Sequence, residues 1–170
     1  LAFGVGRSGV MAKVHRALDT LLPDALRTLA VRLPGRTVHD LRLDLFGFSR
    51  GAASARDAVN RFHRPDSRDW LREQLRRTGW TINADTAAHT RPVRFVGLFD
   101  TVVAVNSRRR DDLPQIALAV DCADTVVQFV ARDEHRQHFA LTSVAPTHEE
   151  ITLPGVHANI GGGYDQRIEG

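Results

Sequence analysis

Three residue types that together catalyse acyl transfer occur at widely separated positions of this sequence. Ser49 stands in Gly47-Phe48-Ser49-Arg50-Gly51, a Gly-x-Ser-x-Gly pattern that follows an apolar run and precedes a helical pattern. This context is typical of a nucleophile elbow, a strained turn that projects the serine hydroxyl from the edge of a sheet. Gly47 and Gly51 are expected to let strand and helix pass closely, and the backbone N–H of Arg50 is expected to face a developing oxyanion. An ordinary glycine-flanked turn is the open alternative.

An acid and a histidine follow the serine in the chain, each near the end of a predicted strand. Asp100 comes directly after the apolar segment 93–99, and His157 closely follows the segment 150–153. In a parallel sheet the carboxyl ends of the strands lie at one edge, so Ser49, Asp100 and His157 are expected to converge there. Ser49 would attack an acyl carbonyl, His157 would transfer its proton, and Asp100 would hold the imidazole in the right tautomer.

Other assignments stay open for these polar residues. Asp133 is the alternative acid, and Asp165 is a more distant one. Asp100 could instead cap the helix that follows it, and His157 could be a turn residue before a glycine run. Asp133 and Glu134 stand beside arginines, so they are also expected to form ion pairs on the face of a helix.

No metal and no cofactor are expected from the sequence. Glu134, His135 and His138 lie close together, but the H-E-x-x-H spacing of a zinc site is absent. The segment 4–9 matches the dinucleotide-binding pattern G-x-G-x-x-G, although only three residues precede it and no strand can be verified. Val10 stands where a phosphate-binding loop would need lysine. A plain loop that enters a helix is the favoured interpretation of this segment.

The predicted elements alternate between strands and helices along the chain. Apolar alternation and helical spacing predict strands at 38–46, 93–99, 116–120 and 150–153, and helices at 10–22, 24–33, 50–62, 67–78 and 121–139. This order predicts an α/β fold with a mostly parallel sheet and helices on both faces. We expect a single domain over 1–170, with an insertion or cap at 64–90. Trp70 and Trp80 lie in that stretch, and packing is favoured over a lid role for them.

The composition is that of an ordinary globular domain. Apolar residues make up 42% of the 170 residues and charged residues 25%, which excludes wholesale disorder. No apolar run is long enough to span a membrane. The net charge of +3 comes from arginines scattered among acids, so no nucleic-acid partner is expected, whereas peripheral contact with anionic lipid headgroups stays open. The single cysteine, Cys122, excludes an internal disulfide and is expected to be buried.

Four blocks of the sequence fall in an order that resembles a known family. They are Gly47 to Ala52, Val96 to Val102, Ala131 to Thr142 and Pro154 to Tyr164. Together they resemble the α/β-hydrolase family of type VI secretion lipase effectors and its bacterial and fungal relatives. The resemblance implies phospholipase A or related ester hydrolysis through a serine nucleophile, without a metal. It also implies a bacterial protein delivered by secretion, with secretion-machinery or immunity-protein partners.

The sequence departs from that family at three points. Asn159 stands where relatives often carry aspartate, which is expected to be tolerated. The opening strand of the family, with an Asp-Gly-Thr turn that is a source of a second oxyanion donor, is absent, and so is the C-terminal part implicated in membrane engagement. We therefore expect an α/β-hydrolase-like fold that is incomplete at both ends. A non-catalytic module that binds membrane or protein partners is the alternative function, and the ester substrate stays open.

Overall fold

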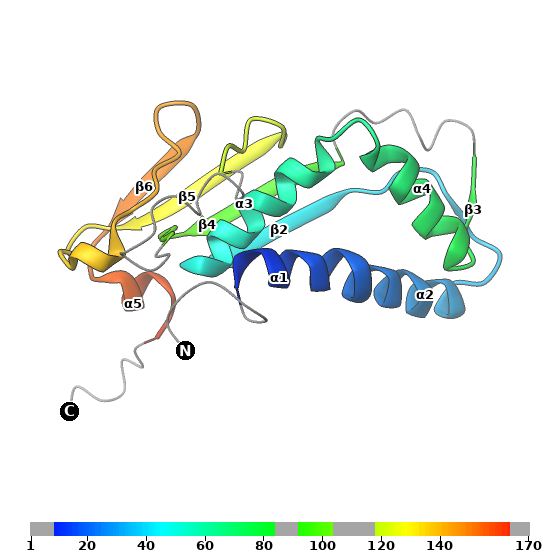
Figure 1. Ribbon diagram of the computed structural model, residues 1–170, viewed down its shortest axis with the longest axis horizontal. Helices are drawn as coiled ribbons and strands as arrows, with labels where there is room; N and C mark the ends of the chain where they lie inside the picture. Colours follow the sequence, from blue (N-terminus) through cyan, green and yellow to red (C-terminus); the bar gives the residue numbers. More distant parts are fainter. Residues whose placement is uncertain (1–8, 84–91, 104–117, 164–170) are drawn as a thin grey trace.

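A four-stranded parallel sheet forms the centre of the computed structural model, which describes residues 9–83, 92–103 and 118–163 (Figure 1). Its strands are ordered β2 (Leu43–Phe48), β4 (Val93–Phe99), β5 (Thr125–Ala131) and β6 (Glu149–Leu153). All three strand pairs are parallel, so the carboxyl ends of the strands share one edge. The predicted strands at 93–99 and 150–153 are confirmed, and the strand expected at 38–46 is displaced toward the elbow.

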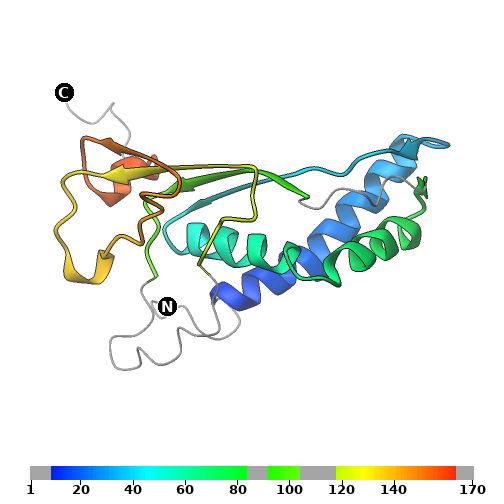
Figure 2. The same ribbon diagram turned by 90° about the horizontal axis from the view of Figure 1, so that it is seen from above.

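Helix α3 (Arg50–Phe62) covers one face of the sheet, as predicted, and α1 (Val10–Arg16) lies beside it (Figure 2). Small residues bring this helix close to the strands, since Ala52 and Ala53 are fully buried. The core between the helix and the sheet contains Val59, Phe62, Val93, Val96, Leu98 and Val126. Because side chains alternate along a strand, one face of β4 and β5 supplies this core while the other face carries phenylalanines.

A short helix, α5 (His157–Ile160), lies at the end of the sheet where the strands terminate (Figure 1). It packs on the ring of Phe48, since a Cβ atom added to Gly161 would meet that ring at 2.5 Å. Phe48 projects from β2 on the face opposite Gly47, which faces α3. Helices therefore occur on both faces of the sheet, as expected.

The helices predicted at 10–22 and 24–33 form one continuous helical run. A π-helical turn, Ala17–Leu21, joins α1 to α2 (Leu22–Arg32). In this turn the N–H of Leu22 donates to the carbonyl of Ala17. Pro23 lies in the first turn of α2, where its missing N–H does not interrupt the pattern. The predicted break at Pro23 is therefore wrong, because the wider turn before it keeps the chain helical.

The end of the molecule opposite α5 is built from α2, α4 (Ser67–Arg77) and a two-stranded sheet of β1 (Thr37–Val38) and β3 (Thr81–Ile82) (Figure 1). Trp70 packs on Phe62, with ring centroids 6.3 Å apart. The indole N–H of Trp80 donates to the carbonyl of Leu26 at 2.9 Å. Both tryptophans thus have packing contacts, while the insertion at 64–90 stays a prediction because residues 84–90 lie outside the described residues.

The helix predicted at 121–139 is wrong. This stretch forms β5 and, after a loop, a 3₁₀ helix, Gln137–Phe139. Val126 and Val130 are buried on one face, and both helical and strand spacing fit these positions. The β-branched Thr-Val-Val run then favours the strand. Residues 118–120 form no strand, and 116–117 lie outside the described residues, so the strand predicted there is not found.

Some sequence features lie outside the described residues. These are Asp165, the Arg108-Arg109-Arg110 cluster and all but the last glycine of the segment 4–9. Cys122 is described and is buried, as predicted. Among the described residues, no helix has both the length and the apolar character to cross a membrane.

Candidate active site

Ser49 occupies a strained turn between β2 and α3. Its backbone has φ 56° and ψ −122°, a left-handed conformation that non-glycine residues rarely adopt. The N–H of Ser49 donates to the carbonyl of Phe99 at 2.9 Å, which ties the turn to the end of β4. Arg50 is the first residue of α3, so its N–H lies at the positive end of the helix dipole.

The two glycines of the elbow differ in what they contribute. A Cβ atom on Gly47 would lie 2.3 Å from the carbonyl oxygen of Gly51, so glycine is required where strand and helix cross. A Cβ atom on Gly51 would meet nothing within 4 Å. The expectation that Gly51 must be small to avoid a clash is therefore wrong, because the close approach uses its backbone and not its missing side chain.

Asp100 and His157 form a buried hydrogen-bonded pair. The Nδ1 atom of His157 lies 2.6 Å from Oδ2 of Asp100, and their side chains are 7% and 4% exposed. The other oxygen, Oδ1, accepts the N–H of Ala131 at 3.0 Å. Asp100 has φ 45°, and its own N–H donates to the carbonyl of Phe129 at 2.7 Å. Both carboxylate oxygens are thus engaged, and the acid is held at the edge of the sheet.

The imidazole of His157 lies between two aromatic rings. Its centroid is 4.5 Å from that of Phe48, at an interplanar angle of 32°. Phe139 meets it edge-on, at 4.8 Å and 71°. Because Phe48 immediately precedes Ser49, this stacking brings the histidine to the elbow, although no hydrogen bond joins Ser49 to His157 among the described residues.

Asp133, the alternative acid, lies just beyond the end of β5 and has other partners. Its carboxylate accepts from Arg132 at 3.0 Å and from the N–H of Gly155 at 2.7 Å. The hydrogen bond from Arg132, followed by that from Gly155, lowers the pKa of Asp133. Ion pairing with arginine was expected, but the residue follows a strand and does not lie on a helix. In the described structure the acid that contacts His157 is Asp100.

Comparison with known proteins places the chain in a family. Residues 55–169 match the family described as T6SS, Phospholipase effector Tle1-like, catalytic domain. The chain belongs to this family. The resemblance seen in the four sequence blocks is thereby confirmed, as is the α/β-hydrolase-like fold. No curated protein sequence matches the chain.

One solved structure adds to the Tle1-like assignment. The Tle1 effector bound to the VgrG spike of the type 6 secretion system superposes with a TM-score of 0.76 and 31% sequence identity, over 92% of this chain. The chain spans 31% of the length of that effector. An uncharacterized protein from Pseudomonas aeruginosa matches at 24% identity and a TM-score of 0.44, over 90% of this chain and 23% of that one, a similarity too weak to support an argument.

A buried polar network in this Tle1-like domain includes Thr101, the residue after Asp100, and sequence reasoning missed it. Gln128 is 0% exposed, accepts the hydroxyl of Thr101, and donates to the carbonyl of Thr142 at 3.1 Å and to Glu150 at 3.0 Å. Burial alone would raise the pKa of Glu150, but hydrogen bonds led by the N–H of Val144 outweigh it, so the pKa is lowered. The network fixes Thr101, the neighbour of Asp100. Its only sequence signal is a glutamine within an apolar strand.

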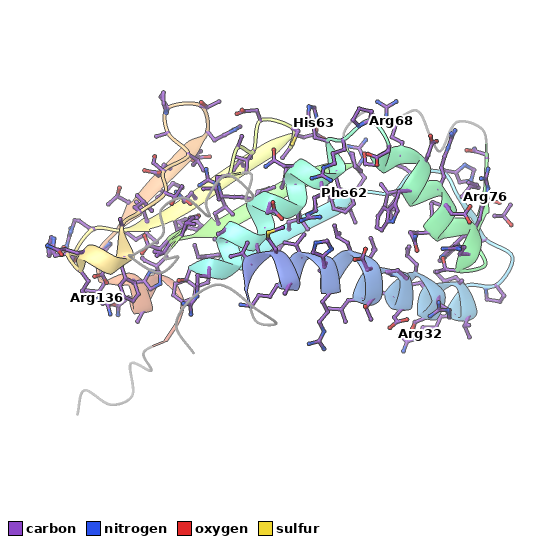
Figure 3. The ribbon with its side chains drawn as sticks, in the orientation of Figure 1. Arg32, Phe62, His63, Arg68, Arg76 and Arg136 are labelled. Carbon is purple, nitrogen blue, oxygen red and sulfur yellow. The ribbon has the colours of Figure 1, made fainter. Side chains whose placement is uncertain are left out.

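The part of the chain that the structure describes contains no cluster of side chains that could bind a metal ion. Within residues 9–83, 92–103 and 118–163, no three His, Cys, Asp or Glu side chains are grouped so as to hold a metal ion. Glu134, which lies close to His135 and His138 in the sequence, forms an ion pair with Arg136 at 2.6 Å. Figure 3 shows Arg136 at the α5 end of the molecule.

Proposed function

We propose that this chain is the core of a serine esterase that cleaves acyl esters of phospholipids, with Ser49 as nucleophile, His157 as general base and Asp100 as the acid. The observation that carries the proposal is the buried 2.6 Å contact between Asp100 and His157, stacked on the residue before Ser49. A buried carboxylate–imidazole pair beside a strained serine is the arrangement that activates a hydroxyl for attack.

The reaction follows from these positions. His157 takes the proton of the Ser49 hydroxyl through Nε2, because Nδ1 is held by Asp100. The serine oxygen bonds to the ester carbonyl carbon, and the oxyanion is stabilised by the N–H of Arg50 at the start of α3. Collapse breaks the ester bond, and the imidazolium returns the proton to the leaving lysophospholipid. Water then hydrolyses the acyl-enzyme by the same steps, releasing a fatty acid and restoring the serine.

The absence of a Ser49–His157 hydrogen bond in the described structure is compatible with this mechanism. Hydrogen bonds between nucleophile and base are often long before substrate binds, and they tighten in the complex. The strained backbone of Ser49 keeps its side chain at the elbow, while the rings of Phe48 and Phe139 hold the imidazole. Binding of the ester is expected to bring the two groups together.

The biological setting is proposed from the family. The Tle1 effector was seen bound to the VgrG spike of the type 6 secretion system. We extend this to the protein that carries the present chain: delivery by secretion from a bacterium, a partner in the secretion machinery, and an immunity protein as a second partner. The substrate, a phospholipid of the target cell, follows from the family description.

The test uses the intact protein and its Ser49→Ala variant. Vesicles of mixed phospholipids are incubated with each, and the released fatty acids and lysophospholipids are identified by mass spectrometry. Removal of the nucleophile is expected to lower kcat by about 10⁴-fold or more, and to abolish labelling by a fluorophosphonate probe. Ser54→Ala is the matched control, because its hydroxyl lies one helical turn further on and only bonds to the carbonyl of Arg50.

Two results would reject the proposal. Equal hydrolysis by the wild type and Ser49→Ala would exclude Ser49 as the nucleophile. A wild type that binds anionic vesicles, but neither reacts with fluorophosphonate nor hydrolyses any ester, would establish the alternative of a non-catalytic binding module.

A further inference from the structure

The loop that follows β5 contacts His157 through residues that are not part of the proposed Ser49–His157–Asp100 triad. Oε2 of Glu134 accepts the backbone N–H of His157 at 3.3 Å. The ring of Phe139 meets the imidazole edge-on at 4.8 Å. Both residues belong to a segment that runs beside the chain between β6 and α5. There the N–H of Asp133 donates to the carbonyl of Gly155, and the N–H of Gly155 donates to the carboxylate of Asp133.

Arg136 joins Glu134 and Phe139 into a closed ring of contacts around the histidine. Its Nε and Nη2 atoms donate to the two oxygens of Glu134 at 2.8 and 2.6 Å, and its backbone N–H donates to the same carboxylate at 2.9 Å. Its guanidinium carbon lies 3.7 Å from the centroid of the Phe139 ring. The contacts therefore run from Glu134 to Arg136, to Phe139, to His157 and back to Glu134.

We propose that Glu134, Arg136 and Phe139 form a positioning clamp that fixes His157 for proton transfer. Glu134 holds the backbone of the histidine, Phe139 holds its ring, and Arg136 keeps these two residues in place. Each acts through His157: Glu134 on its backbone, Phe139 by packing on its ring and Arg136 through these two, so all three are positioning residues. The inference rests on the proposed function, because it assigns a role relative to the base of that reaction.

The need for such a clamp follows from how His157 is attached. It is the first residue of a helix of only four residues, and Gly155, with φ 108°, lies just before it. One turn of helix after a glycine gives little rigidity by itself. Asp100 constrains only one ring nitrogen. The Glu134 side chain is 6% exposed and that of Arg136 is 56% exposed, so the pair reaches solvent on its arginine side. Two side-chain hydrogen bonds and one backbone hydrogen bond from Arg136 fix the carboxylate more tightly than a single exposed contact would.

The test compares Glu134→Ala and Glu134→Gln with the wild type in the intact protein. On a soluble p-nitrophenyl ester, Glu134→Ala is expected to lower kcat by about tenfold to hundredfold while KM changes by less than about twofold, since the base is displaced and substrate contacts are kept. Fluorophosphonate labelling should slow in parallel. Glu134→Gln retains one acceptor oxygen and should fall between the wild type and Glu134→Ala.

Asp44→Asn is the matched control. Asp44 also pairs with both Nε and Nη2 of an arginine, Arg94, but it lies at the amino end of β2, away from His157. This variant should keep the wild-type kcat. If Glu134→Ala keeps it as well, the clamp is rejected. The clamp is also rejected if both variants lose activity in proportion to a lowered unfolding temperature, since that would be a loss of folded protein.

A measurement without turnover separates the clamp from the proposed function. Diethyl pyrocarbonate acylates accessible imidazoles, and peptide mass spectrometry resolves His157 from the other histidines. The rate at His157 should rise severalfold in Glu134→Ala and stay unchanged in Asp44→Asn. This difference in labelling rate is expected even if the wild type hydrolyses no ester, a result that would refute the proposed esterase activity but not the clamp. An unchanged rate in Glu134→Ala would refute the clamp alone.

Discussion

The ring of Phe48 stacks on the imidazole of His157, with their centroids 4.5 Å apart. Phe48 is the last residue of β2, and His157 is the first residue of α5. The contact therefore joins the strand that presents Ser49 to the helix that presents the histidine. It also leaves no room for a side chain at Gly161, where a Cβ atom would lie 2.5 Å from the ring.

Loss of this ring should impair the proposed base, His157, more than loss of the other phenylalanine ring on the same face of β2. Phe48→Ala is expected to lower kcat on a soluble ester by about tenfold or more, because the imidazole loses the surface that holds one of its faces. Phe46→Ala is the control, since Phe46 projects from the same face of β2, is 64% exposed, and does not stack on His157. The measurement is kcat from steady-state kinetics of both variants. An equal loss of kcat in Phe48→Ala and Phe46→Ala would contradict a specific role of Phe48 in holding the imidazole.

The identity of the acid can be decided by two amide substitutions. Asp100→Asn keeps the size of the side chain but removes the charge that stabilises an imidazolium, so kcat should fall by about 10⁴-fold, as in other triads. Asp133→Asn weakens a contact with Gly155 and should cost about tenfold or less. The measurement is kcat on one ester for both variants. The reverse order would make Asp133 the acid.

The two glycines of the elbow should respond in opposite ways to alanine. Gly47→Ala forces a Cβ atom against the backbone of Gly51, and should destabilise the protein by about 1–3 kcal/mol as overpacking does. Gly51→Ala meets open space inside α3 and should stabilise it by about 0.5–1 kcal/mol. Urea unfolding of the two variants gives both values. A destabilised Gly51→Ala would show that its surroundings in the intact protein are occupied.

The Glu134–Arg136 pair should make stability depend on acid pH. Hydrogen bonds from the Arg136 side chain lower the pKa of Glu134 from 4.5 to about 2, against the opposing effect of burial. A carboxylate with a depressed pKa stabilises the fold above its unfolded pKa, and this stabilisation is lost as the pH falls from about 4.5 through about 2. Glu134→Gln should therefore unfold more easily than the wild type at pH 7 and approach it near pH 2.

Thermal unfolding at several pH values checks this dependence. Glu73→Gln serves as the control, because Glu73 pairs with Arg77 on an exposed face of α4 and such pairs contribute little. Its difference from the wild type should be small at every pH. A constant difference between Glu134→Gln and the wild type from pH 7 to pH 2 would contradict the assignment.

Much of the sheet and the elbow could be predicted because their signals are local. The apolar run at β4, the alternation of apolar and polar residues at β6 and the glycine-flanked serine before α3 are each recognisable within about ten residues. β5 could not be separated from a helix in this way. It is a parallel strand with neighbours on both sides, so apolar residues occur on both of its faces and obscure the alternation.

The surroundings of His157 could not be predicted, because they depend on how strands pair. Glu134 reaches the histidine only because the chain beyond β5 continues beside the chain beyond β6. Gln128 joins Thr101 and Glu150 across three neighbouring strands and the loops after them. No spacing in the sequence encodes the register between strands, so these partners become visible only in the folded structure.

The strands β2, β4, β5 and β6 occupy the sheet in the same order as they occur along the chain. This order allows each new strand to dock on the strand that was synthesised before it, so the sheet can be assembled strand by strand during translation. His157 follows the last of these strands in the sequence, so it is synthesised well after Ser49. A nascent chain with the proposed activity would therefore stay inert toward the membranes of the cell that synthesises it until all four of these strands have been synthesised.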